Sequence, residues 1–148
     1  MPRIFKSLDE LKPLAGQVAG SSDWLVISQD KIDRFADLTG DTQWIHTQPE
    51  RARRETDFGN SISHGFLTLS MLSEMSRRAI EIQTDHKMRI NYGLNRVRFV
   101  SPIPAGSRIR GHFTPQSVAD NEVIWSVTVE LEGAPKPALV AEWITRFY

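Results

Sequence analysis

The segment that joins two predicted helices carries a carboxylate and an imidazole. Asp41 and His46 lie five residues apart in this segment. A carboxylate and an imidazole held close together can share the work of a general base, because each can accept a proton from water near neutral pH. The spacing alone also fits a structural role, in which Asp41 caps a turn and His46 makes a structural hydrogen bond.

A second candidate segment, residues 61–66, leads into the longest predicted helix. The first turn of a helix presents unpaired N–H groups and a partial positive charge, so it stabilises a developing oxyanion. Gly65 lets a ligand approach the backbone closely. The structural alternative is that Ser61 or Ser63 caps the helix and Gly65 only permits close packing. His64 is either a ligand or base, or a capping and packing residue.

Other chemistries have weaker support. Asp41, His46 and His64 could converge, but no helical histidine pair or His/Cys signature indicates a metal, and none is predicted. The chain has neither a GxGxxG nor a GxxxxGK[ST] phosphate loop. The surroundings of Ser63 do not match the G-x-S-x-G elbow of a nucleophilic serine.

Four arginines fall at alternating positions of predicted strands: Arg96, Arg98, Arg108 and Arg110. Such a row is typical of a solvated sheet face. It is also compatible with an anion-binding rim for a phosphorylated carrier such as coenzyme A, because guanidinium groups bind phosphate.

The 148 residues are expected to form one domain, residues 1–148. Eighteen Lys and Arg residues balance eighteen Asp and Glu residues, which argues against a nucleic-acid or anionic-membrane binder. The chain has no cysteine, so it has no disulfide framework, and a cytoplasmic location is expected. No signal peptide or run of about 20 apolar residues is recognised.

The pattern of apolar residues predicts the elements that must position these groups. Ser28 is a good N-cap for a helix over residues 29–38, and Gly40 is a typical C-terminal stop. Helical periodicity also covers residues 64–82, whose first half is apolar on most sides and should therefore be enclosed. Strands are predicted at residues 17–27, from 97, around 109–113, at 123–131 and from 139. We therefore expect an α+β fold, an antiparallel sheet wrapped around a long central helix.

Three blocks resemble a known family. Residues 35–46, with Pro49 to Ala52, resemble the hydratase motif of the MaoC-like dehydratases, the (R)-specific enoyl-CoA hydratases of the hot-dog fold. Residues 62–67 match the family's second signature, a His-Gly pair that opens the central helix. Arg98-Phe99 and the prolines that follow match the next strand and loop. Gln43-Trp44 and residues 91–95 look more narrowly like the nodulation protein N-like branch, whereas the broader family usually has Asn-Pro in place of Gln43-Trp44.

The resemblance implies a single hot-dog domain and a hydro-lyase of fatty acid metabolism that needs no metal or redox cofactor. Asp41 and His46 would deprotonate a water molecule that adds to a trans-2-enoyl thioester, carried by coenzyme A or an acyl-carrier protein. The Gly65 N–H would hold the thioester oxygen. The resemblance also implies a homodimer. The expected acyl-pocket wall is Trp44, Phe66 and Leu67, with Ser63, Ser73 and Asn91 as weaker polar candidates.

Two other functions stay open at this point. A hot-dog acyl-CoA thioesterase would need a carboxylate on or near the central helix, where the chain offers only Glu74. A non-catalytic acyl-thioester-binding protein would need a blocked or narrowed pocket, which Trp44 could provide.

Overall fold

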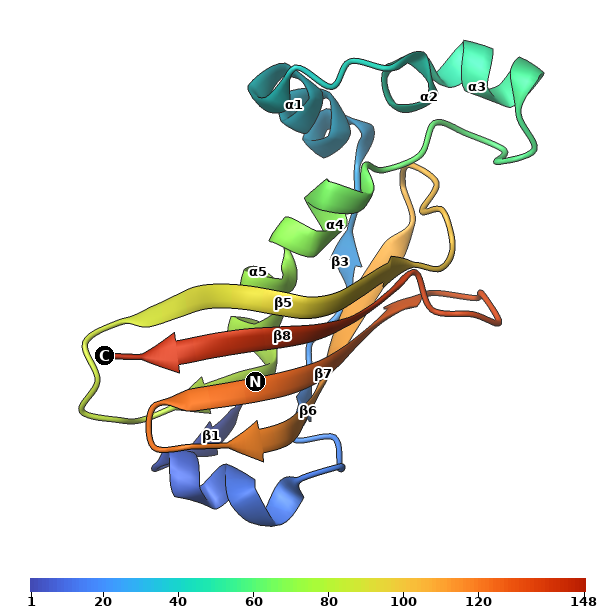
Figure 1. The fold of residues 1–148 in the computed structure, drawn as a ribbon. Helices are drawn as coiled ribbons and strands as arrows, with labels where there is room; N and C mark the ends of the chain where they lie inside the picture. Colours follow the sequence, from blue (N-terminus) through green and yellow to red (C-terminus); the bar gives the residue numbers. More distant parts are fainter.

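An antiparallel sheet curves around a short helical segment in the computed structural model, which describes residues 1–148 (Figure 1). The strand order is β2-β6-β7-β8-β5, and β3 also pairs with β6. Every pair in this sheet is antiparallel, as predicted. The strands are β2 (Gly20–Ser21), β3 (Leu25–Val26), β5 (Arg89–Phe99), β6 (Arg108–Val118), β7 (Glu122–Leu131) and β8 (Leu139–Phe147).

Alternation along the strands decides which face of the sheet is covered. In β7, every second residue from Val123 to Leu131 is buried, and the residues between them are half-buried. β8 alternates in the same way. Successive side chains of a strand point to opposite faces, so one face of the sheet packs on the core and the other meets solvent. β5 lacks this pattern and is mostly exposed, because it pairs only with β8.

The central helix is shorter than predicted and is broken. It consists of α4 (Gly65–Ser70) and α5 (Leu72–Ala79), which meet at Met71. The expectation that the helix continues to Ile82 is wrong, because residues 80–82 form strand β4 (Ile80–Ile82), parallel to β1 (Arg3–Phe5). Two β-branched isoleucines favour an extended backbone, and pairing with a segment distant in sequence overrides the helical periodicity.

The N-terminal region differs from the single strand predicted at residues 17–27. β2 and β3 are two short strands, and the segment between them begins at Ser22, which is hydrogen-bonded to Gly111. The Ser22 N–H donates to the Gly111 carbonyl at 2.9 Å, and the Ser22 Oγ accepts from the Gly111 N–H at 3.0 Å. Before them, β1 and a 3-10 helix, Leu8–Leu14, bury apolar side chains that the sequence pattern did not assign to any element.

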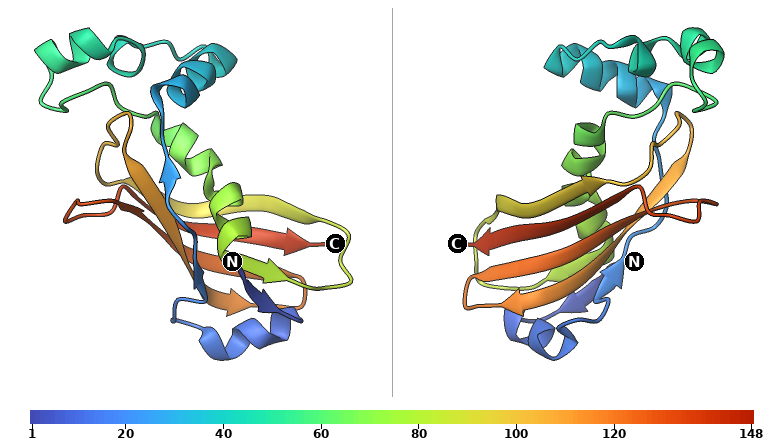
Figure 2. Two further views of the ribbon diagram at one scale, coloured as in Figure 1. Left: turned by 180° about the vertical axis from the view of Figure 1, so that it is seen from behind. Right: turned by 45° about the vertical axis from the view of Figure 1, so that its right-hand side comes forward.

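Three helices extend beyond one end of the sheet, next to the start of α4 (Figure 2). They are α1 (Gln29–Thr39), α2 (Trp44–Thr47) and α3 (Pro49–Glu55). Ser28 caps α1 as predicted, because its Oγ accepts from the Lys31 N–H at 3.2 Å. The short helix α2 replaces the loop expected at residues 41–46. No helix in the chain has the length and apolar character needed to cross a membrane.

The core lies between α5 and the buried face of the sheet. Leu72 and Met75 of α5 are buried within the same apolar cluster as Phe113 and Val127 of the sheet. Met75 has no exposed surface. Burial of such side chains supplies the main driving force that holds the helix on the sheet.

Met75→Ala should lower the free energy of unfolding by about 2–5 kcal/mol, because it removes buried methylene groups and leaves a cavity. Urea unfolding followed by circular dichroism measures this change. Leu38→Ala is the matched control, since Leu38 is 83% exposed on α1, and it should change stability by less than about 0.5 kcal/mol. Equal losses in the two variants would contradict this account of the core.

Candidate active site

A cavity of about 660 Å³ opens at the start of α4, below α1 and α2. Five of the predicted site residues line it, namely Asp41, His46, Ser63, Gly65 and Phe66. The other lining residues are Phe35, Thr39, Phe58, Ile62, His64, Thr68, Phe99, Ser101, Pro102, Ile103 and Ala138. The sequence pattern did not predict most of this second set as site residues. Phe99, the residues 101–103 that follow it and Ala138 lie beside the cavity because β5 pairs with β8.

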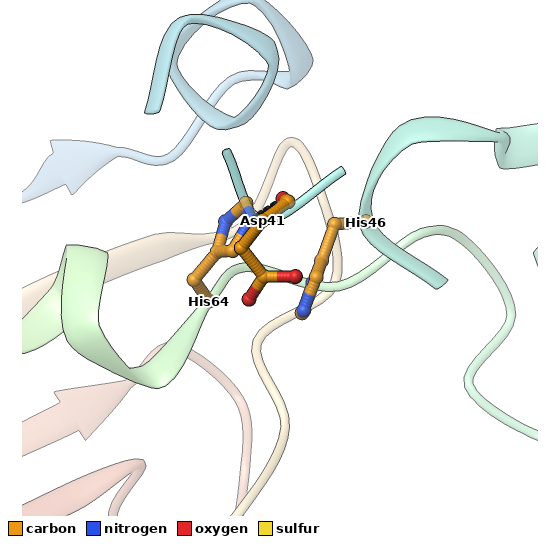
Figure 3. A group of neighbouring side chains, drawn as sticks. All are labelled: Asp41, His46 and His64. Carbon is orange, nitrogen blue, oxygen red and sulfur yellow. Dashed lines mark hydrogen bonds between the residues drawn. The ribbon is translucent and has the colours of Figure 1, made fainter. Parts of the chain in front are cut away.

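Asp41 follows α1 directly. Gly40 ends that helix with a φ of 79°, a left-handed conformation that glycine adopts without strain, and this turns the chain toward the cavity. The backbone carbonyl of Asp41 accepts a hydrogen bond from Nε2 of His64 at 2.9 Å. No side chain or backbone group bonds the Asp41 carboxylate, which lies beside the His46 ring (Figure 3). The carboxylate is therefore free to accept a proton.

His46 lies in α2 and is buried. Its Nδ1 donates to the carbonyl of Ile62 at 2.7 Å, and since a carbonyl only accepts, Nδ1 carries the ring proton. Nε2 is then the unprotonated nitrogen. Burial lowers the pKa of His46, against the opposing effect of the Ile62 hydrogen bond, and nearby His64 lowers it further. His46 is therefore neutral near pH 7, as a general base must be.

Backbone hydrogen bonds tie the loop before α4 to two other segments. The Ile62 N–H donates to Ile45 at 2.9 Å, and the Ser63 N–H donates to Ile103 at 2.8 Å. Gln29 of α1 adds a side-chain link, because its Nε2 donates to the His46 carbonyl at 2.7 Å. Groups from four parts of the chain are thus held in one arrangement.

The His64 side chain packs in the site but does not cap α4. Its ring stacks on that of His46, with centroids 3.8 Å apart and planes inclined by 23°. Its Nε2 donates to the Asp41 carbonyl, and its Nδ1 is buried without a partner. The possible ligand atoms of Asp41, His46 and His64 lie within 4.8 Å of one another, so these are the residues that could hold a metal. Because His64 Nε2 is a donor here and His64 Nδ1 is sealed from solvent, the acceptors that remain accessible from the cavity are the Asp41 carboxylate and His46 Nε2.

Gly65 begins α4 against an aromatic ring. A Cβ atom at this position would lie 2.9 Å from the ring of Phe99, so any other residue here would require that ring to move. The Gly65 N–H donates to no group in the chain. A free backbone donor therefore lies on the cavity wall, as predicted for a group that binds an oxyanion.

Four residues predicted for the site lie outside this cavity. Leu67 was expected to wall it but is buried in the apolar core instead. Trp44 does not line it; its ring packs under the guanidinium of Arg51, 4.2 Å from ring centroid to Cζ. The expectation that Trp44 walls the cavity is therefore not met, because α2 directs this side chain to α3. Ser73 and Asn91 bond each other at 3.2 Å and line a separate cavity of about 310 Å³ beside β5.

The row of arginines divides into two kinds. Arg108 pairs with Glu132, and Arg110 pairs with Glu130 at 2.6 Å, each across neighbouring strands. These pairs match the solvated-face interpretation and not an anion-binding rim. Arg96 and Arg98 have no acidic partner.

The comparisons of this chain with known proteins all identify one family. Residues 10–133 match the family model described as a MaoC like domain. The chain is 45% identical to 3-hydroxyacyl-thioester dehydratase Z of Mycobacterium tuberculosis, over 98% of both chains. It is also 45% identical to Nodulation protein N of Rhizobium leguminosarum bv. viciae, over 94% of this chain and 89% of that protein.

Among solved structures, the (R)-hydratase from A. caviae involved in PHA biosynthesis superposes with a TM-score of 0.73. The two chains are 20% identical, and the match covers 89% of this chain and 97% of the other. At this identity the likeness concerns the fold, and it confirms the hot-dog architecture.

The environment of His46 predicts a pH dependence. Its pKa lies below the ordinary value of 6.5 when the chain is folded, so the folded chain binds fewer protons than the unfolded chain at lower pH. Stability that is complete above about pH 6.5 should therefore fall as the pH drops below that value. Nuclear magnetic resonance titration of the His46 ring measures the pKa directly. In urea unfolding, His46→Gln should lose less stability than the wild type between pH 7.5 and 5.5. A His46 midpoint at or above 6.5 would contradict the prediction.

Proposed function

This chain belongs to the family of MaoC-like dehydratases and is a hydro-lyase, and on that premise we propose that it acts on trans-2-enoyl thioesters. It adds water syn across the double bond to form the (3R)-hydroxyacyl thioester, and it dehydrates that product in reverse. The observation that carries the proposal is the free Asp41 carboxylate beside the neutral His46, both on one cavity with the free Gly65 N–H. The name of the mycobacterial relative, a 3-hydroxyacyl-thioester dehydratase, supports the substrate class.

The proposed steps use the side chains in fixed roles. Asp41 and His46 Nε2 bind a water molecule and take one of its protons as its oxygen bonds to C3 of the substrate. The π electrons move toward the thioester carbonyl, and the Gly65 N–H stabilises the enolate oxygen that forms. The dyad then returns a proton to C2, which collapses the enolate to the thioester. Because the same dyad holds the attacking water and returns the proton to C2, the hydroxyl and the hydrogen add to one face and addition is syn.

The cavity wall suits an acyl thioester. Apart from the acid–base groups its lining is largely apolar or aromatic, with Phe35, Phe58, Phe99 and Ile103 as its larger side chains. Such a wall binds the acyl chain and excludes bulk water, which strengthens electrostatic interactions near the reacting atoms.

Two observations disfavour the alternative functions. Glu74, the only carboxylate that a thioesterase could use on the central helix, pairs with Arg78 at 2.6 Å and does not line the cavity. Trp44, which was expected to narrow the pocket of a non-catalytic binder, lies outside it. The hydratase proposal therefore accounts for more of the site.

We also propose that the protein is a homodimer in which two β5 strands pair. β5 is an edge strand with 11 residues, so one side of its backbone has no partner in the chain. It exposes large apolar side chains, Ile90, Tyr92, Leu94 and Phe99. Long apolar edges of this kind are normally covered in native proteins, and pairing with a second copy covers this one.

Asp41→Asn and His46→Gln should each lower kcat for crotonyl-CoA hydration at least about 100-fold, because each removes part of the general base. Loss of absorbance from the conjugated thioester measures turnover, and chiral analysis should identify (3R)-hydroxybutyryl-CoA. Asp37→Asn is the control, since it neutralises an exposed carboxylate of α1 outside the cavity. Near-normal turnover in either dyad variant would refute the assignment, and release of free CoA by the wild type would indicate a thioesterase.

Leu94→Lys should convert the dimer to monomers, because it places a charge in the middle of the proposed β5 interface. Analytical ultracentrifugation measures the change. Leu38→Lys introduces the same charge at an exposed position of α1 and should leave the dimer intact. If the wild type sediments as a monomer, or if both variants remain dimeric, β5 is not the interface.

A further inference from the structure

A basic cavity of about 410 Å³ lies at the opposite end of the central helix from the candidate active site. Figure 1 shows the β4–β5 connection beside the C-terminus, at the end of the sheet away from α1, α2 and α3. The cationic residues that line the cavity are Arg77 at the end of α5, Lys87 in the connection, and Arg89 at the start of β5. His86 also lines it, with Met88 and Phe147 among the apolar residues.

Arg89 is half-buried without an acidic partner. Its Nη2 donates to the Oγ of Ser76 at 2.6 Å, and its guanidinium lies 5.6 Å from the ring centroid of Trp143. Its other N–H groups have no acceptor in the chain, and they remain accessible to solvent. Burial lowers the pKa of Arg89, and the charge of Arg77 lowers it further. The neighbouring Arg78 shows the opposite direction, because hydrogen bonds to Glu74 and Asp23 raise its pKa.

The other two cations are also uncompensated. Neither Arg77 nor Lys87 forms an ion pair, although most arginines of the chain do. Glu81 is the one acidic side chain that lines the cavity, and it accepts a hydrogen bond from Gln83 at 3.0 Å. Two arginines held close together, one of them half-buried, repel each other unless an anion lies between them. No contact within the chain therefore accounts for three cations gathered around this cavity.

We propose that this cavity binds the phosphate group of a phosphate ester, held by Arg77, Lys87 and Arg89. Guanidinium groups match the geometry of phosphate oxygens and bind them through paired hydrogen bonds, and a lysine adds a compact charge. The apolar walls formed by Met88 and Phe147 have no function for an inorganic ion, but they can contact the organic part of an ester. The site lies outside the residues that the hydration reaction uses.

Two sources can supply such a group. One is the nucleotide end of a coenzyme A substrate, an assignment that rests on the proposed function. The other is a free phosphate ester that binds independently of catalysis. Both present the same chemistry to the three cations, so they are separated by experiment.

Isothermal titration calorimetry with adenosine 3′,5′-bisphosphate tests the site without any turnover. Arg77→Gln and Arg89→Met should each weaken binding at least about tenfold, and added salt should weaken binding to the wild type. Arg77 is exposed, so Arg77→Gln should fold normally even if Arg89→Met does not. Arg54→Gln removes another exposed arginine that forms no ion pair, and it should bind like the wild type. No binding to the wild type, or equal binding to all variants, would overturn the proposal.

Steady-state kinetics of Arg77→Gln then distinguishes the two sources. With crotonyl-CoA and crotonyl-N-acetylcysteamine as substrates, a rise in KM for the CoA thioester alone identifies the nucleotide end of the substrate as the ligand. An unchanged KM, together with lost bisphosphate binding, identifies a free phosphate ester. If the wild type hydrates neither thioester, the proposed function fails, while the calorimetric result for the phosphate site still stands.

Discussion

The hydrogen bond from His46 Nδ1 to the Ile62 carbonyl is the constraint on which the site depends. It selects the tautomer that leaves Nε2 unprotonated, and it joins α2 to the segment that enters α4. The same segment is bonded to Ile45 and to Ile103, so the orientation of one imidazole is coupled to the α1–α3 region and to the loop after β5. Hydrogen bonds between several segments of the chain therefore position the acid–base pair, and no single loop does so alone.

The members of this pair work in different surroundings. His46 is buried and is kept neutral by desolvation, whereas Asp41 is exposed and has no hydrogen bond to its carboxylate. His64 connects them, because it stacks on the His46 ring and holds the Asp41 backbone. The Asp41 carboxylate keeps its contact with solvent, while the buried His46 ring is positioned by its hydrogen bond to Ile62 and its stacking on His64. The division places one solvated and one desolvated base on the same cavity.

Much of the fold could be predicted from short-range patterns. The alternation of β7, the Ser28 cap and the Gly40 stop each act within a few residues, and the structure confirms them. The errors arose where distant segments decide the outcome. Ile80–Ile82 forms a strand and not the predicted helical turn, because β1 pairs with it. Trp44 lies outside the cavity, because α2 directs its side chain to Arg51. The candidate dyad could be predicted from residue types and family resemblance. The cavity wall formed by residues 99–103 and Ala138 could not, because it depends on the pairing of β5 with β8.

That pairing also has a consequence for synthesis of the chain on the ribosome. β5 ends at Phe99, and its only neighbour in the chain, β8, begins at Leu139. A strand that exposes several large apolar side chains must therefore wait without its partner until β6, β7 and β8 have been translated. At about 5–20 residues per second this wait lasts several seconds, long enough for aggregation or chaperone binding. During this interval β5 is open to pairing with the wrong strand or with another chain.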